Sequence, residues 1–170
     1  ILLNDETIEG ENSFIEIINH QLFTVSYDSF FQVNRDICSK LFNLINKHIN
    51  DNETILDLYC GVGTLGINAS KNAKKAFGIE IVKNAVLNAI TNSKINKRDN
   101  IYYMLGDVSS CLPKIKDKVD TIIVDPPRAG LDKVTKDTII EFNPNKIIYV
   151  SCDPMTLARD LKELSSYYNI

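Results

Sequence analysis

The chain has 170 residues, of which 44% are apolar and 24% charged, a composition typical of one compact globular domain. Its apolar runs reach about six residues, far short of the roughly 20 that a membrane-spanning helix needs, and no signal-peptide pattern opens the chain, so we expect a cytoplasmic protein. Because the net charge is −3, any contact with nucleic acid should be local or supplied by another segment.

Four cysteines are widely separated, and they are Cys38, Cys60, Cys111 and Cys152. The chain has no Cys-x-x-Cys pair and only two histidines, which argues against a zinc or iron–sulfur framework and against a disulfide scaffold. We therefore expect free thiols and no metal.

Residues 1–26 are predicted to be β structure, with strands at 14–18 and 22–25 on either side of a short polar turn. A ribbon this short is not stable alone. We therefore assign residues 1–28 to a β ribbon or linker from a preceding domain and residues 29–170 to the main domain. Because the chain starts at Ile1 without methionine, we expect it to be a piece of a longer protein.

A helix is predicted over about 35–49, because Asn34 can cap it and apolar residues follow at helical spacing. Its apolar face would carry Ile37, Leu41, Leu44, Ile45 and His48. The adjacent Phe30 and Phe31 are interpreted as a hydrophobic staple or as core anchors.

From residue 51 strands alternate with helices. Strands are expected at 55–59, 76–79, 101–105, 121–124 and 146–150, with helices at about 64–73, 82–93 and 132–141 and a last one from Pro154. This alternation predicts an α/β fold whose parallel sheet has helices on both faces. In such a sheet the carboxyl ends of the strands line the ligand crevice.

The first of these strands leads into Gly61-x-Gly63-x-x-Gly66, and Glu80 closes the second strand, which together make a nucleotide-binding fingerprint. The glycines let the backbone approach a ligand, and a carboxylate at the second strand end can accept both ribose hydroxyls. A dinucleotide and S-adenosylmethionine are the competing ligands. Asp57 favours the second, because a carboxylate near the turn would repel a pyrophosphate. Asp107 either accepts the adenine amino group or caps the following helix.

The fourth strand ends in Asp125-Pro126-Pro127-Arg128, a stiff loop in which Asp125 can accept a ring N–H and Arg128 can bind a carbonyl or phosphate. A rigid turn with a surface ion pair is the alternative. Lys133 and Lys136, just beyond, are interpreted as a solvated helix face.

The fifth strand delivers Cys152 to the same edge of the sheet. A thiol beside a base-binding carboxylate and a methyl donor suits alkylation at carbon 5 of a pyrimidine, because thiolate addition at carbon 6 makes carbon 5 nucleophilic. A small buried cysteine is the simpler alternative.

Five segments together resemble the RNA uridine-5-methyltransferases of the RumA and TrmA type: Phe30–Asn34, Asp57–Thr64, Gly78–Glu80, Asp125–Arg128 and Ser151–Leu161. The resemblance implies a class I methyltransferase (Rossmann-like) fold and an RNA substrate. It implies that the S-adenosylmethionine pocket is formed by Gln32, Tyr59, Gly61, Thr64, Glu80, Asp107 and Asp125. It also implies that Cys152 is the catalytic nucleophile toward carbon 6 of the uracil.

Asp153 stands where the family often has asparagine, which bears on the surroundings of the thiol. The family's N-terminal RNA-binding and iron–sulfur segments and its C-terminal glutamate base have no counterpart here, so we expect a monomeric catalytic fragment, truncated at the C-terminus. We expect a uridine of 23S ribosomal RNA as the substrate. The alternatives are transfer RNA, a non-catalytic RNA-binding module and a nicotinamide-dependent dehydrogenase.

Overall fold

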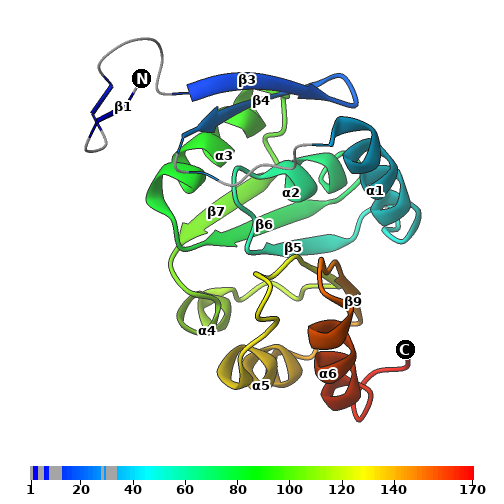
Figure 1. Ribbon diagram of the computed structural model, residues 1–170. Coiled ribbons are helices and arrows are strands. Elements are labelled where there is room, and N and C mark those ends of the chain that lie inside the picture. Colours follow the sequence, from blue (N-terminus) through cyan, green and yellow to red (C-terminus); the bar gives the residue numbers. More distant parts are fainter. Residues whose placement is uncertain (1, 4–5, 8–12, 28, 30–33) are drawn as a thin grey trace.

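The computed structural model describes residues 2–3, 6–7, 13–27, 29 and 34–170, and its centre is a five-stranded parallel sheet (Figure 1). Along the sheet the strands are β7 (Ile101–Leu105), β6 (Lys75–Glu80), β5 (Thr54–Leu58), β8 (Thr121–Val124) and β9 (Lys146–Tyr149). All residues of β5 are buried, as expected for a central strand covered on both faces. The predicted α/β fold with a parallel sheet is confirmed.

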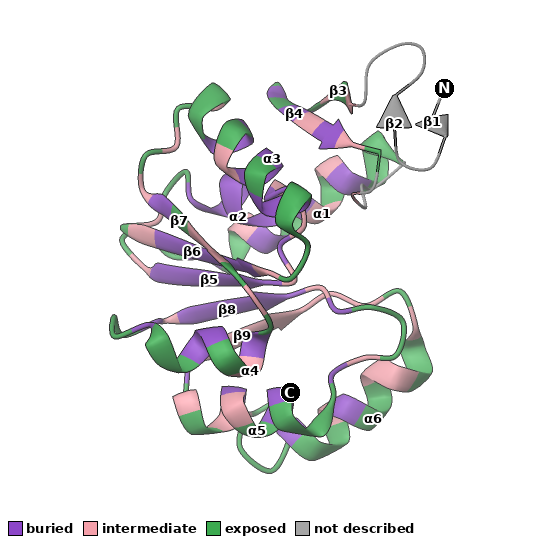
Figure 2. Cartoon of the chain, turned by 90° about the vertical axis from the view of Figure 1, so that its left-hand side faces the viewer, coloured by how far each residue is buried: buried purple, intermediate pink, exposed green. Residues whose placement is uncertain are grey.

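Helices cover both faces of this sheet (Figure 1). One face carries α1 (Arg35–Lys47), α2 (Thr64–Ala69) and α3 (Lys83–Ile95), and the other carries α4 (Val108–Cys111), the 3₁₀ turn η1 (Leu112–Lys114), α5 (Lys133–Phe142) and α6 (Pro154–Leu164). Neighbouring residues of β5 belong to different cores, because Ile55 packs in one cluster and Leu56 in the other. Figure 2 shows buried residues along the central strands and exposed residues on the outer sides of the helices.

Local capping explains where the helices begin. The side chain of Asn34 accepts a hydrogen bond from the Ile37 amide, and Asp153 does the same for Met155 and Thr156 before Pro154, the first residue of α6. The strands at 121–124 and 146–149 and the starts of α3, α5 and α6 agree with the sequence prediction within one residue.

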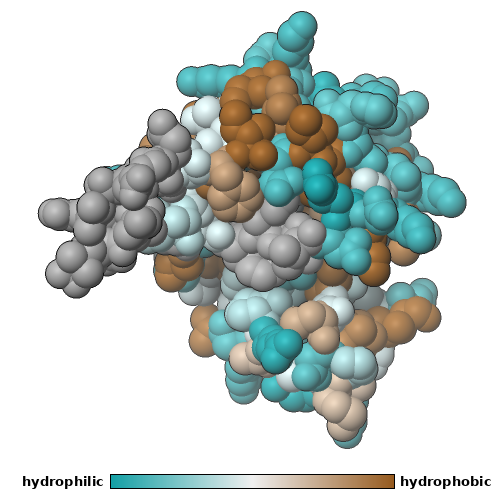
Figure 3. Space-filling view, turned by 45° about the horizontal axis from the view of Figure 1, so that its top comes forward, coloured by the Kyte–Doolittle hydropathy of each residue, from teal (hydrophilic) through white to brown (hydrophobic). Residues whose placement is uncertain are grey.

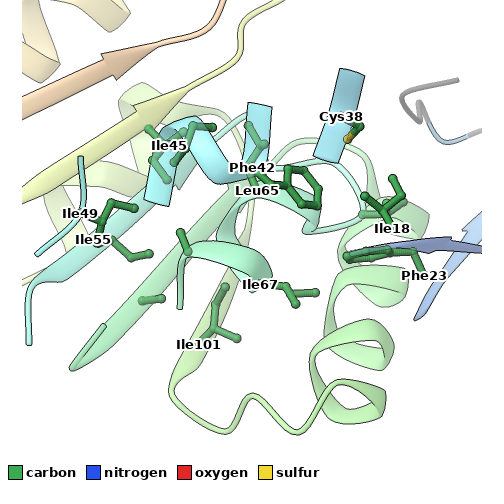
Figure 4. Packing of buried hydrophobic residues seen from close by; sticks show 14 of the residues in the cluster. Ile18, Phe23, Cys38, Phe42, Ile45, Ile49, Ile55, Leu65, Ile67 and Ile101 are labelled. Atoms are coloured by element: carbon green, nitrogen blue, oxygen red, sulfur yellow. The ribbon is translucent and has the colours of Figure 1, made fainter. Parts of the chain in front are cut away.

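The buried face of α1 agrees with the prediction in part, because Ile45 is buried and Leu41 packs against the core as expected. Cys38, Phe42 and Ile45 pack into the core (Figure 4), while Ile37 is 62% and Leu44 55% exposed. Cys38 and Phe42 have helical spacing, and so do Ile37 and Leu44. Periodicity alone could therefore not show which pair faces the core. The packing partners, which come from β3, β4 and α2, decide the face.

The N-terminal hairpin packs on the same core. Strands β3 (Ser13–Ile18) and β4 (Gln21–Ser26) are joined by Asn19 and His20, whose φ angles of 48° and 62° suit a two-residue hairpin turn. Ile18 and Phe23 share the hydrophobic cluster of α1 (Figure 4), and Val25 belongs to the same cluster. A domain boundary at residue 28 stays a prediction, and the predicted staple at Phe30 and Phe31 lies outside the described residues.

Apolar side chains also remain on the outside of this hairpin, where Ile15, Ile17 and Leu22 are exposed. Figure 3, which turns the top of Figure 1 toward the viewer, shows hydrophobic patches within a mostly hydrophilic surface. In the described part of the chain, none of the helices has the length and hydropathy to cross a membrane. A second, separate pair of strands is formed by β1 (Leu2–Leu3) and β2 (Glu6–Thr7).

Candidate active site

The candidate residues follow five neighbouring strands at one edge of the sheet. In spatial order these are Asp107 after β7, Glu80 at the end of β6, the glycine turn after β5, Asp125 after β8 and Cys152 after β9. The strand order reverses between β5 and β8, which is where open α/β sheets bind their ligands. The ends of β8 and β9 are held side by side, because Val124 pairs with Tyr149 and accepts a 2.8 Å hydrogen bond from the Val150 amide.

The glycine turn needs its glycines for two different reasons. Gly61 and Gly63 have φ angles of 53° and 87°, which side chains disfavour. At Gly66 a Cβ would lie 2.9 Å from Asp57 Oδ2, so α2 could not pack as closely on β5. Tyr59 also has a positive φ of 60°, a strained conformation for a residue with a side chain.

Asp57 lies beneath this turn, where its Oδ2 accepts a 2.7 Å hydrogen bond from the Gly66 amide. It is 1% exposed, and its Oδ1 has no protein partner. Burial raises its pKa to about 8; the Gly66 hydrogen bond opposes this shift, and the charges of Asp125 and Glu80 add to it. The Asp57 carboxyl group therefore holds the backbone of the turn.

A cavity of about 220 Å³ opens beside the turn. It is lined by Tyr59, Ile79, Glu80, Ile81, Gly106, Asp107, Val108, Ser109, Asp132 and Thr135. Three predicted cofactor residues, Tyr59, Glu80 and Asp107, thus share one cavity. Gly61 and Thr64 belong to the adjacent turn and the start of α2, Asp125 follows the next strand, and Gln32 lies outside the described residues.

Two carboxylates in this cavity are held by backbone amides. Glu80 accepts hydrogen bonds from Gly61 N at 3.0 Å and Val82 N at 2.8 Å. Asp107 caps α4 by accepting from Ser110 N at 2.9 Å, so its capping role is confirmed. Hydrogen bonds from the Ser109 and Ser110 hydroxyls and the Ser110 amide lower the Asp107 pKa to about 2. Both carboxyl groups are therefore anchored acceptors with oxygen lone pairs still available, and the apolar walls beside them suit a nucleoside.

Asp132 and Thr135 were missed as cavity residues. The sequence showed Asp132 only as the start of a helix, and it does cap α5 by accepting from Thr135 N at 2.8 Å. The position of α5 over the cavity depends on packing against η1 and α4, for which the sequence carries no local signal.

Cys152 is exposed, whereas Cys38, Cys60 and Cys111 are buried. The loop before α6 is braced at Ser151, whose hydroxyl donates to Asp153 O and accepts from Asp153 N, at 2.9 and 3.1 Å. Burial, with a contribution from Asp125, raises the pKa of Cys38 to about 11, and burial also raises that of Cys60. Cys152 is therefore the one cysteine that can meet a substrate without unfolding.

The Arg128 loop approaches the start of α6. The Thr156 and Met155 amides lower the pKa of Asp153 by hydrogen bonding, and the charge of the exposed Arg128 contributes to the same shift. Lys136, in contrast, does not lie on a solvated face. It is 4% exposed and pairs with Asp160, because α5 packs beside α6. The described residues contain no group of three histidine, cysteine or acidic side chains that could hold a metal ion.

Comparisons with known proteins agree with this arrangement. An uncharacterized RNA methyltransferase of Clostridium acetobutylicum is 42% identical over 163 residues, which are 95% of this chain and 36% of that protein. One from Caldanaerobacter subterraneus is 42% identical over 159 residues, 92% of this chain and 35% of the relative. The chain thus spans little more than a third of these relatives.

Among solved structures, the Pyrococcus abyssi tRNA (uracil-54, C5)-methyltransferase in complex with S-adenosyl-L-homocysteine superposes with a TM-score of 0.78. The two are 32% identical, over 91% of this chain and 38% of that one. Methanocaldococcus jannaschii TYW2 in complex with AdoMet, 23% identical over 81% of this chain and 61% of its own, shares the fold with a TM-score of 0.64. The sequence profile of the tRNA (uracil-5-)-methyltransferases matches residues 3–108 and 114–170. With these matches along nearly its whole length, the chain belongs to the tRNA (uracil-5-)-methyltransferase family.

Proposed function

We propose that the protein carrying this chain methylates carbon 5 of a uridine in RNA through a covalent adduct with Cys152. The observation that carries this proposal is the position of the exposed Cys152, one strand away from Asp125 and two from the glycine turn. Family membership and the anchored carboxylates of the neighbouring cavity support it.

S-adenosylmethionine is the proposed methyl donor, and when bound it supplies an electrophilic methyl group on a positively charged sulfur. Glu80 would hold the ribose hydroxyls and Asp107 the adenine amino group, with Tyr59 against the nucleoside and Gly61 and Thr64 along the turn. The 220 Å³ cavity, with two anchored carboxylates and walls such as Ile79 and Val108, fits an adenosine moiety.

The proposed reaction starts with the Cys152 thiolate. It adds to carbon 6 of the flipped-out uracil, and the electrons of the carbon 5–carbon 6 double bond move toward oxygen 4. Asp125 accepts the ring N–H and Arg128 holds a carbonyl or phosphate, so the ring is fixed while carbon 5 takes the methyl group. The methyl–sulfur bond of the donor breaks in the same step, and its electron pair leaves with S-adenosylhomocysteine. Loss of the carbon 5 proton to a base then restores the double bond and expels the thiolate, which balances the reaction.

For the substrate we retain a uridine of 23S ribosomal RNA as the proposal. The transfer RNA named for the Pyrococcus abyssi enzyme is the alternative. Total RNA from cells in which the gene has been deleted carries this protein's own target in unmethylated form, so mapping the labelled nucleotide after reaction with methyl-labelled S-adenosylmethionine identifies the class.

The central test compares Cys152→Ser with Cys111→Ala in the full-length protein, using this RNA and 5-fluorouridine-substituted RNA. Fluorine cannot leave carbon 5 as a proton does, so it traps the adduct. We expect Cys152→Ser to lose methylation and adduct, while Cys111→Ala, a change at a buried cysteine that does not line the cavity, retains both. Normal methylation by Cys152→Ser would refute the covalent mechanism.

A further inference from the structure

Asp160 of α6 is fully buried although it is charged, and its carboxylate joins segments that are distant in the sequence. Its Oδ2 accepts hydrogen bonds from the Leu131 amide and from the Tyr149 hydroxyl, both at 2.8 Å. Leu131 lies between the Asp125–Arg128 loop and α5, and Tyr149 ends β9. One oxygen thus links the two strand ends that carry Asp125 and Cys152.

The second oxygen, Oδ1, accepts hydrogen bonds from two cationic side chains. Arg159 donates from Nε at 3.0 Å and from Nη2 at 2.9 Å, and Lys136 Nζ lies at 3.3 Å. The Lys136 side chain is 5% exposed, and its other partner is the half-exposed Glu163 at 2.7 Å. Removal of the Asp160 charge would therefore weaken the pairing of the buried Lys136 ammonium group, which would then depend on the half-exposed Glu163.

The surroundings keep Asp160 ionised. Burial opposes ionisation, but hydrogen bonds from Leu131, Tyr149, Arg159 and Lys136 outweigh it and lower the Asp160 pKa. Burial together with the Asp160 charge raises the pKa of Tyr149, so its hydroxyl stays a donor.

The loop after β8 is shaped to fit against this carboxylate. Arg159 Nη2 also donates to the Ala129 carbonyl at 2.7 Å, and Gly130 has a φ of 73°. A Cβ at Gly130 would lie 2.5 Å from Asp160 Oδ2 and 2.6 Å from Arg159 Nη2. Only glycine fits there, so the backbone of the loop is held in direct contact with α6 at Arg159 and Asp160.

We propose that Asp160 is a positioning residue for the methylation reaction, which holds the loop of Asp125 and Arg128 in register with the loop of Cys152. The inference rests on the proposed function, because it concerns the placement of those side chains. Asp160 acts through Leu131, Tyr149 and Arg159 and does not itself reach the substrate, since it is fully buried. Small displacements of reacting groups, on the order of 1 Å, can cost about a hundredfold in rate.

The test uses Asp160→Asn in the full-length protein, with Glu163→Gln as the matched control. The first change keeps the side-chain shape and removes the charge that Lys136 and Arg159 share, while the second removes only the solvent-facing partner of Lys136. Methylation of total RNA from gene-deleted cells is measured as kcat per site that binds S-adenosylhomocysteine, so unfolded protein does not count.

We expect Asp160→Asn to lower kcat at least tenfold with KM for S-adenosylmethionine within threefold, and Glu163→Gln to match the wild type. Arg159→Ala provides a second variant, because Arg159 is half exposed and its loss leaves Lys136 to balance Asp160. It should also lower kcat more than it raises KM for RNA.

Equal kcat per binding site in the wild type and both variants would overturn the positioning role, and so would an effect confined to KM for RNA. A Cys152→Ser protein that methylates in the same assay would instead refute the proposed function. The two failures are therefore distinguishable.

Discussion

Asn92 of α3 and Thr24 of β4 exchange two hydrogen bonds, from Thr24 N to Asn92 Oδ1 at 2.7 Å and from Asn92 Nδ2 to Thr24 O at 3.0 Å. The amide side chain pairs with the strand edge as a neighbouring strand would. Asn96, one helical turn later, makes the same exchange with Leu22. The fully buried Asn92 also donates to the Val62 carbonyl at 3.0 Å, within the glycine turn.

From the contact between Asn92 and Val62 we predict that a substitution outside the pocket weakens cofactor binding. Asn92→Ala should destabilise the fold by about 1–3 kcal/mol, because it leaves buried backbone groups unpaired, and should also weaken S-adenosylhomocysteine binding by loosening the turn. Asn96→Ala removes an equivalent pair of hairpin bonds and should leave cofactor affinity unchanged. Urea unfolding and calorimetric titration of both variants check this, and equal loss of affinity in the two would contradict the role of the Val62 contact.

A second prediction concerns Glu80. Glu80→Ala should reduce the affinity for S-adenosylhomocysteine by about 1–3 kcal/mol, because it removes the ribose acceptor and also releases Gly61 N and Val82 N. Glu80→Gln keeps one acceptor oxygen and should lose less. Titration calorimetry measures both, and unchanged binding in Glu80→Ala would contradict the assignment of the cavity.

Thiol accessibility gives a third prediction. In the native protein iodoacetamide should modify Cys152, while the other three cysteines of this chain should react only in denaturant because they are buried. The raised pKa values of Cys38 and Cys60 should protect these thiols further even in mildly alkaline buffer. Peptide mass spectrometry locates the label, with Cys152→Ala as the control; native labelling of Cys38 or Cys60 would contradict the packing described here.

From the raised pKa of Asp57 we predict how the free energy of unfolding changes with pH. Its pKa is about 8 in the folded protein against 3.8 ordinarily, so between these values the folded state holds a proton that the unfolded state has lost. This group therefore lowers stability as pH rises from about 4 to 8, by at most about 1.4 kcal/mol per pH unit. Asp57→Asn should flatten the decline between pH 6 and 8 in urea unfolding. The same slope in both proteins would show that Asp57 is not responsible.

The local features of this protein could be predicted from the sequence. Periodicity located the five strands, and the Asn34 cap and Pro154 located two helix starts, because these signals depend on residues within about four positions. The position of Cys152 and Asp125 at the same edge of the sheet followed from the alternation of strands and helices.

Tertiary structure decided what distant segments do to one another. The buried face of α1, the pairing of Asn92 with β4, the cavity roles of Asp132 and Thr135, and the burial of Lys136 against Asp160 all depend on such contacts. The Asn92–Thr24 pair is 68 residues apart and the Lys136–Asp160 pair 24. An asparagine or lysine on a helix has the same local sequence pattern whether solvent or another segment covers it, so only the packed chain shows which of these polar groups are structural.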